Sequence, residues 1–347
     1  MQNVKPLEGL RVAEMASYLS GPYATLMLAD MGATVTKIEP PEGDPYRKFG
    51  ARNNGVGVIW QIVNRDKPLD TIDLKQPEGL ARFLDVVRAS DVLVLNQRRK
   101  ALERMGLTAD VLREANPDLL VAYVTGYGND GPMTERPAYD AILQGMTGSV
   151  HYQMPGQQVE ASPYFLVDKV TAAYVAQAIV AALYGKKNGS RILELDLSML
   201  HIATYFNFPD LMYQTAHVGQ EKSWRAPQSV IFGTRDGHLI LSPVTGRQLS
   251  ATLDALGLSE HKDAFKAMAD KDAMLSGFFK LVRARLLEGN SNDWLKRLEE
   301  HDVPCGPVLT AEALLENEQI RANGVIEERD TAWGRMRRVT YPARFWS

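Results

Sequence analysis

The sequence is poor in the residues that build disulfide frameworks and metal centres. Its 347 residues include a single cysteine, Cys305, which excludes a disulfide framework and a cysteine-based metal site within one chain. Cys305 stands in a turn-rich segment, residues 303–307, without the nearby histidine or helix start that activates a catalytic thiol. The six histidines are scattered and form no i, i+4 pair, so we expect no metal site and a structural cysteine.

Net charge and long apolar runs are also lacking. The formal net charge is -3, which argues against a general affinity for nucleic acid or a membrane surface. No run of about 18 apolar residues is found, and residues 1–10 lack the apolar core of a signal peptide. We therefore expect a cytoplasmic protein. The hydrophobic content of 45% is enough for a substantial core, and the length suggests about two domains or one large one.

The glycine-rich loops that bind nucleotide phosphates are absent. Residues 14–21, after the first expected strand, contain no G-x-G-x-x-G pattern, so a dinucleotide pyrophosphate would lack the close backbone approach it needs. Glu39, at the end of the second expected strand, could mimic a ribose-binding acid, but without the glycines this signal is weak. A Walker-type glycine-lysine loop is missing too. We therefore expect no permanently bound cofactor.

The first half of the chain alternates short apolar runs with helical patterns. This alternation predicts βαβ units and a mostly parallel sheet, with ligands at the carboxyl ends of the strands. The expected helices include residues 21–31, 78–88 and 137–146. The expected strands are residues 10–15, 33–38, 70–74, 91–95, 119–124 and 192–196.

The pattern changes after residue 205, which predicts a second, smaller α+β unit. Strand-like runs at 229–232 and 238–243 flank a turn, and helical patterns follow at 247–256, 272–288 and 292–300. We expect a large Rossmann-like α/β domain over 1–205, completed by a strand and tail within 325–347. The small domain would span 225–308, with linkers at 206–224 and 309–324.

Asp168 carries the clearest chemical signal. It precedes a small-residue run at 171–184 that has helical spacing, so it falls at or near a helix start. The positive end of the helix would keep its carboxylate ionised, and an ionised aspartate at a fixed point is a usable oxygen nucleophile. The alternative is a helix N-cap, for which aspartate is a preferred residue.

A basic stretch, residues 96–104, follows the fourth expected strand. Arginine is suited to holding phosphate through two hydrogen bonds, and Lys75 and Arg136 would join the same rim if the strands align. The alternative for this stretch is a solvated basic turn.

Short motifs run in a fixed order along nearly the whole chain. They occupy residues 6–12, 20–22, 31–40, 43–44, 64–67, 72–75, 91–96, 103–107, 116–117, 126–128, 131–132, 137–140, 168, 236–237, 303–308 and 341–345. Each is weak alone, but their number and order are specific. In these motifs the sequence resembles the family III coenzyme A transferases and their relatives, the α-methylacyl-CoA racemases.

The resemblance implies a fold, an assembly and a site. The fold is a Rossmann-like large domain and a small domain joined by two long linkers, and two subunits interlock as a homodimer. An aspartate at the position of Asp168 is the nucleophile. The residues expected to contact coenzyme A or acyl-CoA are Ser20, Pro40, Ile72, Asp73, Leu74, Lys75, Asn96, Gln97, Arg98, Arg104, Arg136, Pro137, Ala138, Tyr139 and Asp140. Lys75, Arg98 and Arg104 are the expected phosphate partners.

The leading hypothesis is a CoA transferase that moves CoA from an acyl-CoA donor to a carboxylic acid through an aspartyl-CoA thioester on Asp168. The second is an acyl-CoA racemase, which needs two proton-transfer groups. Racemases carry a histidine where this chain has Tyr139, and a phenol with a pKa of about 10 is a poor base near neutrality. The third is a catalytically silent CoA-binding protein, since residues 218–225 lack the glycine run of many family members.

Overall fold

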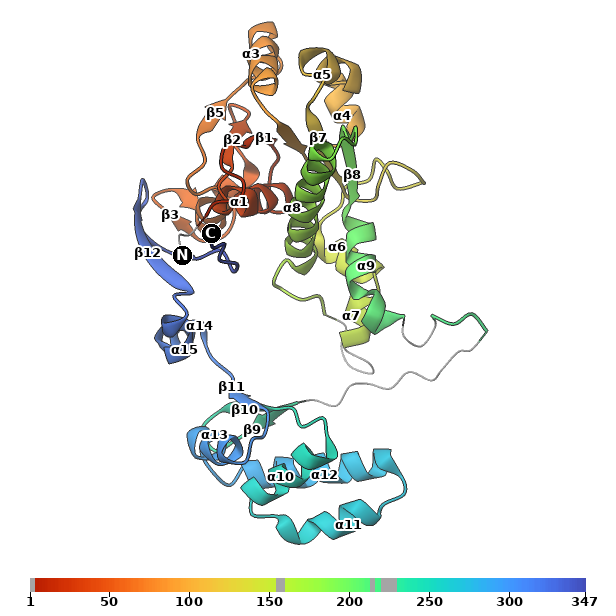
Figure 1. Cartoon of the computed structure of the whole chain (residues 1–347), viewed down its shortest axis with the longest axis vertical. Helices are drawn as coiled ribbons and strands as arrows, with labels where there is room; N and C mark the ends of the chain where they lie inside the picture. Colours follow the sequence, from red (N-terminus) through yellow and green to blue (C-terminus); the bar gives the residue numbers. More distant parts are fainter. Residues whose placement is uncertain (1–3, 154–159, 213–215, 220–229) are drawn as a thin grey trace. The chain divides into compact units, whose positions relative to one another are not determined.

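The computed structural model describes residues 4–153, 160–212, 216–219 and 230–347 (Figure 1). The chain forms two compact units, Met1–Trp224 with Val325–Ser347, and Arg225–Gly324. Residues 206–224 thus belong to the first unit, and residues 309–324 belong to the second. Their role as linkers stays a prediction.

The first unit is built on a six-stranded sheet with strand order β5-β2-β1-β6-β7-β8. Every neighbouring pair in it is parallel, so the expected parallel α/β fold is confirmed. The strands are β1 (Arg11–Met15), β2 (Thr34–Glu39), β5 (Leu69–Thr71), β6 (Val92–Leu95), β7 (Leu120–Thr125) and β8 (Glu194–Ser198).

Helices cover both faces of this sheet, as Figure 1 shows. In β6, Val92 and Val94 belong to the core shared with α1 and α8, whereas Leu93 and Leu95 belong to the core shared with α3 and α5. A strand buried on both faces reads as a continuous apolar run, which explains this sequence. The helices named here are α1 (Ser20–Asp30), α3 (Pro77–Arg88), α5 (Ala109–Ala115) and α8 (Leu166–Lys187).

Helix α8 has the length and apolar composition of a membrane-crossing helix, although about 39% of the residues in its apolar stretch are buried. It packs along α1 and contributes Val167, Val175 and Ile179 to the sheet core. These contacts make α8 part of the core that covers one face of the sheet.

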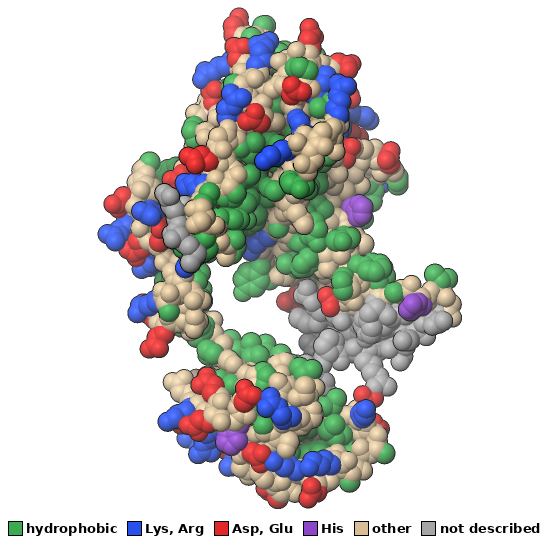
Figure 2. All heavy atoms as spheres, viewed as in Figure 1, with side chains coloured by type: hydrophobic (Ala, Val, Ile, Leu, Met, Phe, Trp, Pro, Cys, Tyr) green, Lys and Arg blue, Asp and Glu red, His purple; other side chains and the backbone are tan. Residues whose placement is uncertain are grey.

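Smaller elements complete the first unit. They are η1 (Pro45–Lys48), β3 (Arg52–Asn53), β4 (Val56–Gly57), α2 (Val58–Val63), α4 (Arg99–Arg104), α6 (Asp140–Met146), α7 (Ser149–Gln153), α9 (Met199–Leu211), β12 (Ile326–Thr331) and β13 (Gly334–Val339). Charged side chains of both signs are interspersed around α3 and α5 on the face drawn in Figure 2, in keeping with the small net charge.

Several expected elements differ at their ends. The strand expected at 70–74 ends at Thr71, because the Asp73 carboxylate turns back to accept the Lys75 N–H at 3.0 Å. The helix expected from residue 137 begins at Asp140, since Tyr139 is extended. Helix α2 and the hairpin β3–β4 are short, and no prediction was made for them.

The second unit is a three-stranded antiparallel sheet covered by helices, so the expected smaller α+β unit is confirmed. Its core contains Phe232, Leu239, Phe278 and Trp294. Cys305 is half-buried in β11, and burial raises the pKa of its thiol, which fits a structural role. The elements are β9 (Ile231–Gly233), β10 (His238–Leu241), α10 (Gly246–Ala255), η2 (Ser259–His261), α11 (Lys262–Ala267), α12 (Lys271–Leu286), α13 (Ser291–Glu300), β11 (Cys305–Pro307), α14 (Ala311–Glu316) and α15 (Glu318–Ala322).

Candidate active site

A cavity of about 870 Å³ lies in the first unit, where segments following β1, β6 and β7 meet. This is the carboxyl edge of a parallel sheet, the usual ligand site of such folds. The cavity brings together ten of the residues expected from the sequence. They are Ser20, Asn96, Gln97, Arg98, Arg136, Pro137, Ala138, Tyr139, Asp140 and Asp168.

Six expected contacts lie outside the lining of this cavity. They are Pro40, Ile72, Asp73, Leu74, Lys75 and Arg104, and their role in CoA binding stays a prediction. The Lys75 side chain is 80% exposed and lies near Glu42, whereas the Arg104 guanidinium donates to the Lys100 carbonyl on its own helix.

Asp168 is the third residue of α8, and the N-cap is Phe165, which makes no side-chain cap. The alternative interpretation of Asp168 as a helix cap is therefore wrong. The N–H of Asp168 instead donates to the Asp140 Oδ2 atom at 3.0 Å. A carboxylate from α6 thus satisfies an N–H group in the first turn of α8 that has no partner within the helix.

The proton affinity of Asp168 differs from the expected value. Burial, and secondly the negative charge of Asp140, raise the pKa of Asp168 from 3.8 to about 7. Burial disfavours the charged form of a carboxyl, and a like charge nearby adds to that effect. The expectation that the helix start keeps Asp168 ionised left out these two effects, both of which favour the protonated form.

Asp140 is itself held from two sides. Its Oδ1 atom accepts a hydrogen bond from the Gln144 amide. Gln144 also donates to the Ser162 carbonyl at 3.0 Å and accepts the Ser162 N–H at 2.8 Å. Asp140 is only 6% exposed. This arrangement fixes the start of α6, the segment before α8 and α8 itself relative to one another.

Aromatic side chains form one side of the cavity, and most of them were missed from the sequence. Tyr18, Tyr46, Phe49 and Phe165 line it together with the expected Tyr139. Tyr18 follows β1 and Tyr46 follows β2. The general rule that ligands bind at strand carboxyl ends could have drawn attention to these loops, but no motif marks the individual residues.

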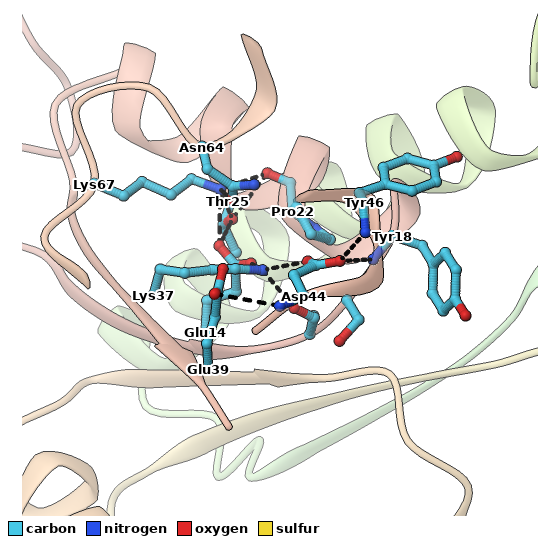
Figure 3. Close-up of polar contacts among 12 residues, drawn as sticks. Glu14, Tyr18, Pro22, Thr25, Lys37, Glu39, Asp44, Tyr46, Asn64 and Lys67 are labelled. Atoms are coloured by element: carbon cyan, nitrogen blue, oxygen red, sulfur yellow. Dashed lines mark hydrogen bonds and ion pairs between the residues drawn. The ribbon is translucent and has the colours of Figure 1, made fainter. Parts of the chain in front are cut away.

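A buried cluster of charges lies behind this wall (Figure 3). The Lys37 ammonium contacts Glu14 and Asp44, each at 2.9 Å. Lys67 contacts the other oxygen of Glu14 at 2.8 Å, and the Thr25 hydroxyl donates to that oxygen at 2.6 Å. The four charged side chains are at most 1% exposed. Two cations and two anions therefore balance inside the protein.

The cluster controls the ionisation of its members. Burial alone would raise the pKa of Glu14, but the ammonium groups of Lys37 and Lys67 lower it to about 2. Burial lowers the pKa of Lys67 to about 8, against the opposing effect of Glu14. At neutral pH Glu14 and Lys67 thus remain charged and paired.

Asp44 connects the cluster to the cavity. One oxygen faces Lys37, and the other accepts the N–H groups of Tyr18 at 3.2 Å and Tyr46 at 2.9 Å. Figure 3 shows both tyrosine side chains extending away from the charges. The buried ion pairs therefore hold the backbone that carries two cavity rings.

The Glu39 carboxylate is held by three protein groups, which is a structural role. Its carboxylate accepts from Arg47 at 2.6 Å, from the Trp60 indole at 2.9 Å and from the Asp44 N–H at 3.2 Å. It is 3% exposed and does not line the cavity. The interpretation of Glu39 as a ribose-binding acid is therefore wrong.

Comparison with known proteins extends along the whole chain. Residues 7–347 match the family model described as CoA-transferase family III. The succinate–glutarate CoA-transferase of Agrobacterium fabrum is 31% identical over 344 residues, which cover 94% of this chain and 86% of that protein. The human succinyl-CoA:glutarate CoA-transferase is 28% identical over 94% of this chain and 77% of its own length.

A solved structure of a CAIB/BAIF family protein from Brucella suis has the same fold. It superposes with a TM-score of 0.87 at 27% identity, covering 99% of this chain and 93% of that chain.

The charge cluster predicts a large stability effect at Lys37. Lys37→Met should lower the free energy of unfolding by about 3–5 kcal/mol, because it leaves the Glu14 and Asp44 charges without a shared cation. Lys75→Met, at an exposed lysine, is the matched control and should change it by less than about 0.5 kcal/mol. Chemical denaturation measures both. Equal midpoints for the two variants would contradict a stabilising role for the cluster.

The raised pKa of Asp168 predicts a pH-dependent stability. The folded chain binds this proton more tightly than the unfolded chain, so the contribution of Asp168 to the free energy of unfolding falls between pH 4 and pH 7 and is constant above. Asp168→Asn removes this loss. The free energy of unfolding of this variant should exceed that of the wild type only slightly near pH 4, and by roughly 1–4 kcal/mol at pH 8. A gain that is independent of pH would show that Asp168 ionises as an ordinary carboxyl.

Proposed function

This chain belongs to CoA-transferase family III, and we propose that it moves coenzyme A from an acyl-CoA donor to a carboxylic acid through a covalent intermediate on Asp168. The observation that supports this most directly is the position of Asp168. Its half-buried carboxyl lines a cavity of about 870 Å³ at the carboxyl edge of the sheet. A carboxylate in that setting is a nucleophile that water hydrates poorly.

The reaction begins with attack of a carboxylate oxygen of Asp168 on the thioester carbonyl carbon. The C–S bond breaks, CoA leaves as a thiolate, and the aspartyl and acyl groups form a mixed anhydride. The thiolate then attacks the aspartyl carbonyl, which gives an aspartyl-CoA thioester and releases the donor acid as a carboxylate. The acceptor carboxylate repeats both steps in reverse, so Asp168 is regenerated without net consumption of a proton.

The environment of Asp168 suits this exchange. Only the ionised form attacks, and a pKa of about 7 leaves about half of it ionised at neutral pH. The same burial makes the carboxylate more basic, and hence more nucleophilic, than one in water. Backbone N–H groups near the starts of α6 and α8 are the donors we expect for the oxyanions of the two tetrahedral steps.

Arg98 and Arg136 are the basic residues of the described lining, and we assign them to the CoA phosphates. Lys75 and Arg104 would extend the phosphate site beyond the cavity. A carboxylic acid acceptor agrees with the names of similar proteins, which act on glutarate, oxalate or (R)-2-hydroxy-4-methylpentanoate.

The two alternative functions have little support. Proton removal from the carbon beside the thioester needs a second base, and the described cavity lining contains no histidine. Tyr139, which stands where the racemases carry a histidine, is 55% exposed. A silent CoA-binding protein would not need a carboxyl at the position of Asp168 in the cavity lining.

The nucleophile is tested by Asp168→Ala. We expect the rate of CoA transfer to fall by at least about 10³-fold, because the covalent route is removed. The affinity for CoA should stay within a few-fold of the wild-type value. Hydroxylamine should trap an acylated Asp168 in the wild type when acyl-CoA is present, as peptide mass spectrometry would detect. Asp110→Ala, in the first turn of α5, is the control. Full turnover by Asp168→Ala would refute the mechanism.

The phosphate site is tested by Arg98→Ala and Arg104→Ala. A hydrogen bond to a charged group contributes about 1.5–3 kcal/mol, so each change should weaken CoA binding by roughly tenfold or more in calorimetry. Arg88→Ala, at an exposed arginine of α3, is the control. Unchanged affinity would mean that residues 96–104 are only a solvated basic turn.

We also propose the interlocked homodimer that the resemblance implies. Interlocked rings cannot separate unless a chain path opens, so dilution should release no monomer until the protein unfolds. Sedimentation velocity over a wide concentration range measures this. A monomer fraction that grows on dilution under native conditions would rule out the interlocked topology.

A further inference from the structure

Five aromatic rings form a continuous wall in the cavity that contains Asp168. This aromatic wall consists of Tyr18, Tyr46, Phe49, Tyr139 and Phe165. The ring centroids of Tyr139 and Tyr18 are 5.8 Å apart, those of Tyr18 and Tyr46 5.4 Å, and those of Tyr46 and Phe49 5.0 Å. Phe49 and Phe165 close the wall at 6.2 Å. Edge-to-face and stacked contacts at these distances are favourable aromatic geometries.

Two of these rings stand on strained backbone. Tyr18 has φ of 65° and Phe165 has φ of 47°, in the left-handed region that disfavours bulky side chains. The other non-glycine residues with positive φ in the described chain are Asn54, Asp66 and Asp302, which belong to the types that tolerate it. A strained residue is kept where the surrounding structure and a function require it. Both strained aromatic residues line the same cavity, which points to a use for their rings.

Much of the wall is open to the cavity. Tyr18 is 37% exposed, Phe49 45% and Tyr139 55%, although Tyr46 behind them is 4% exposed. Exposed aromatic surface that lines a cavity is a binding surface for an apolar group.

Among the residues that the structure describes, the wall itself presents no cation to a second carboxylate. The neighbouring Arg47 guanidinium bonds Glu39 and lies 3.7 Å from the Trp60 ring centroid, and it is not part of the lining. The Lys169 ammonium lies 5.9 Å from the Tyr164 ring, also outside the lining. Asp140 and Asp168 line the same cavity. Arg98 and Arg136, the arginines of the described lining, are assigned to the CoA phosphates. An acyl group whose free carboxylate lay at the wall would therefore meet apolar rings and the carboxyls of Asp140 and Asp168, which is costly without a further cation.

We propose that the acyl group handled at Asp168 is that of a monocarboxylic acid with an apolar substituent the size of an aromatic ring. The carboxyl carbon would lie at Asp168 and the ring would pack against Tyr18, Phe49 and Phe165. This inference rests on the proposed transferase function, because it names the class of acid that this function would use.

The test compares two acyl-CoA donors that differ in the end group, 3-phenylpropanoyl-CoA and glutaryl-CoA. Two measurements are made: the affinity of the Asp168→Ala variant for each thioester by calorimetry, and acid release in a single turnover of the wild type by quenched flow. We expect 3-phenylpropanoyl-CoA to bind at least tenfold more tightly and to release its acid at least tenfold faster than glutaryl-CoA.

Variants locate the preference on the wall. Phe165→Ala and Tyr18→Gly, the second of which also relieves the left-handed backbone, should each lower the preference for 3-phenylpropanoyl-CoA at least fivefold. Tyr184→Ala, at a 68% exposed tyrosine of the same helix as Asp168, should leave it unchanged.

The outcomes separate this inference from the proposed function. Equal or tighter binding of glutaryl-CoA, or a preference that survives both wall variants, overturns the inference. Selective binding without acid release from either thioester supports the aromatic subsite and refutes the transferase mechanism instead.

Discussion

The buried ammonium of Lys37 is the contact on which the rest of the cavity depends. It joins Glu14 of β1, the Ala16 carbonyl and Asp44 before η1 in a space that excludes water. Because an unpaired charge inside a protein is very costly, none of these groups can move alone. The loops after β1 and β2 are therefore held at one separation, and Tyr18 and Tyr46 take their positions from it.

The architecture and part of the site could be predicted because local signals carry them. Alternating apolar runs and helical patterns predict a parallel sheet, and the carboxyl ends of its strands share one edge. The strand pattern thus placed the basic stretch 96–104 at that edge, whereas the placement of residues 137–140 with Asp168 in one site came from the family resemblance. Motif order along the chain added the family, which the comparisons confirm.

The remaining features depend on contacts between distant parts of the sequence. The pKa of Asp168 reflects burial and the charge of Asp140, which is 28 residues away. The sequence next to Asp168 indicates only a helix start. Asp44 reaches Tyr18 across 26 residues, so no spacing rule reveals the aromatic wall. Lys37 sits in a strand where alternation alone gives no indication that its ammonium is buried between two carboxylates.

Asp140 serves two purposes with one carboxylate. It accepts the N–H group that places α8, and its charge helps to set how tightly Asp168 holds a proton. Residues 137–139, directly before it, line the cavity where the acyl-CoA would lie. Any reshaping of this segment for a different acid therefore also shifts the position of the nucleophile and the pH at which it is charged. Variants of this protein that accept a different acid should therefore also work at a different pH, because the side chain of Asp140 couples the two properties.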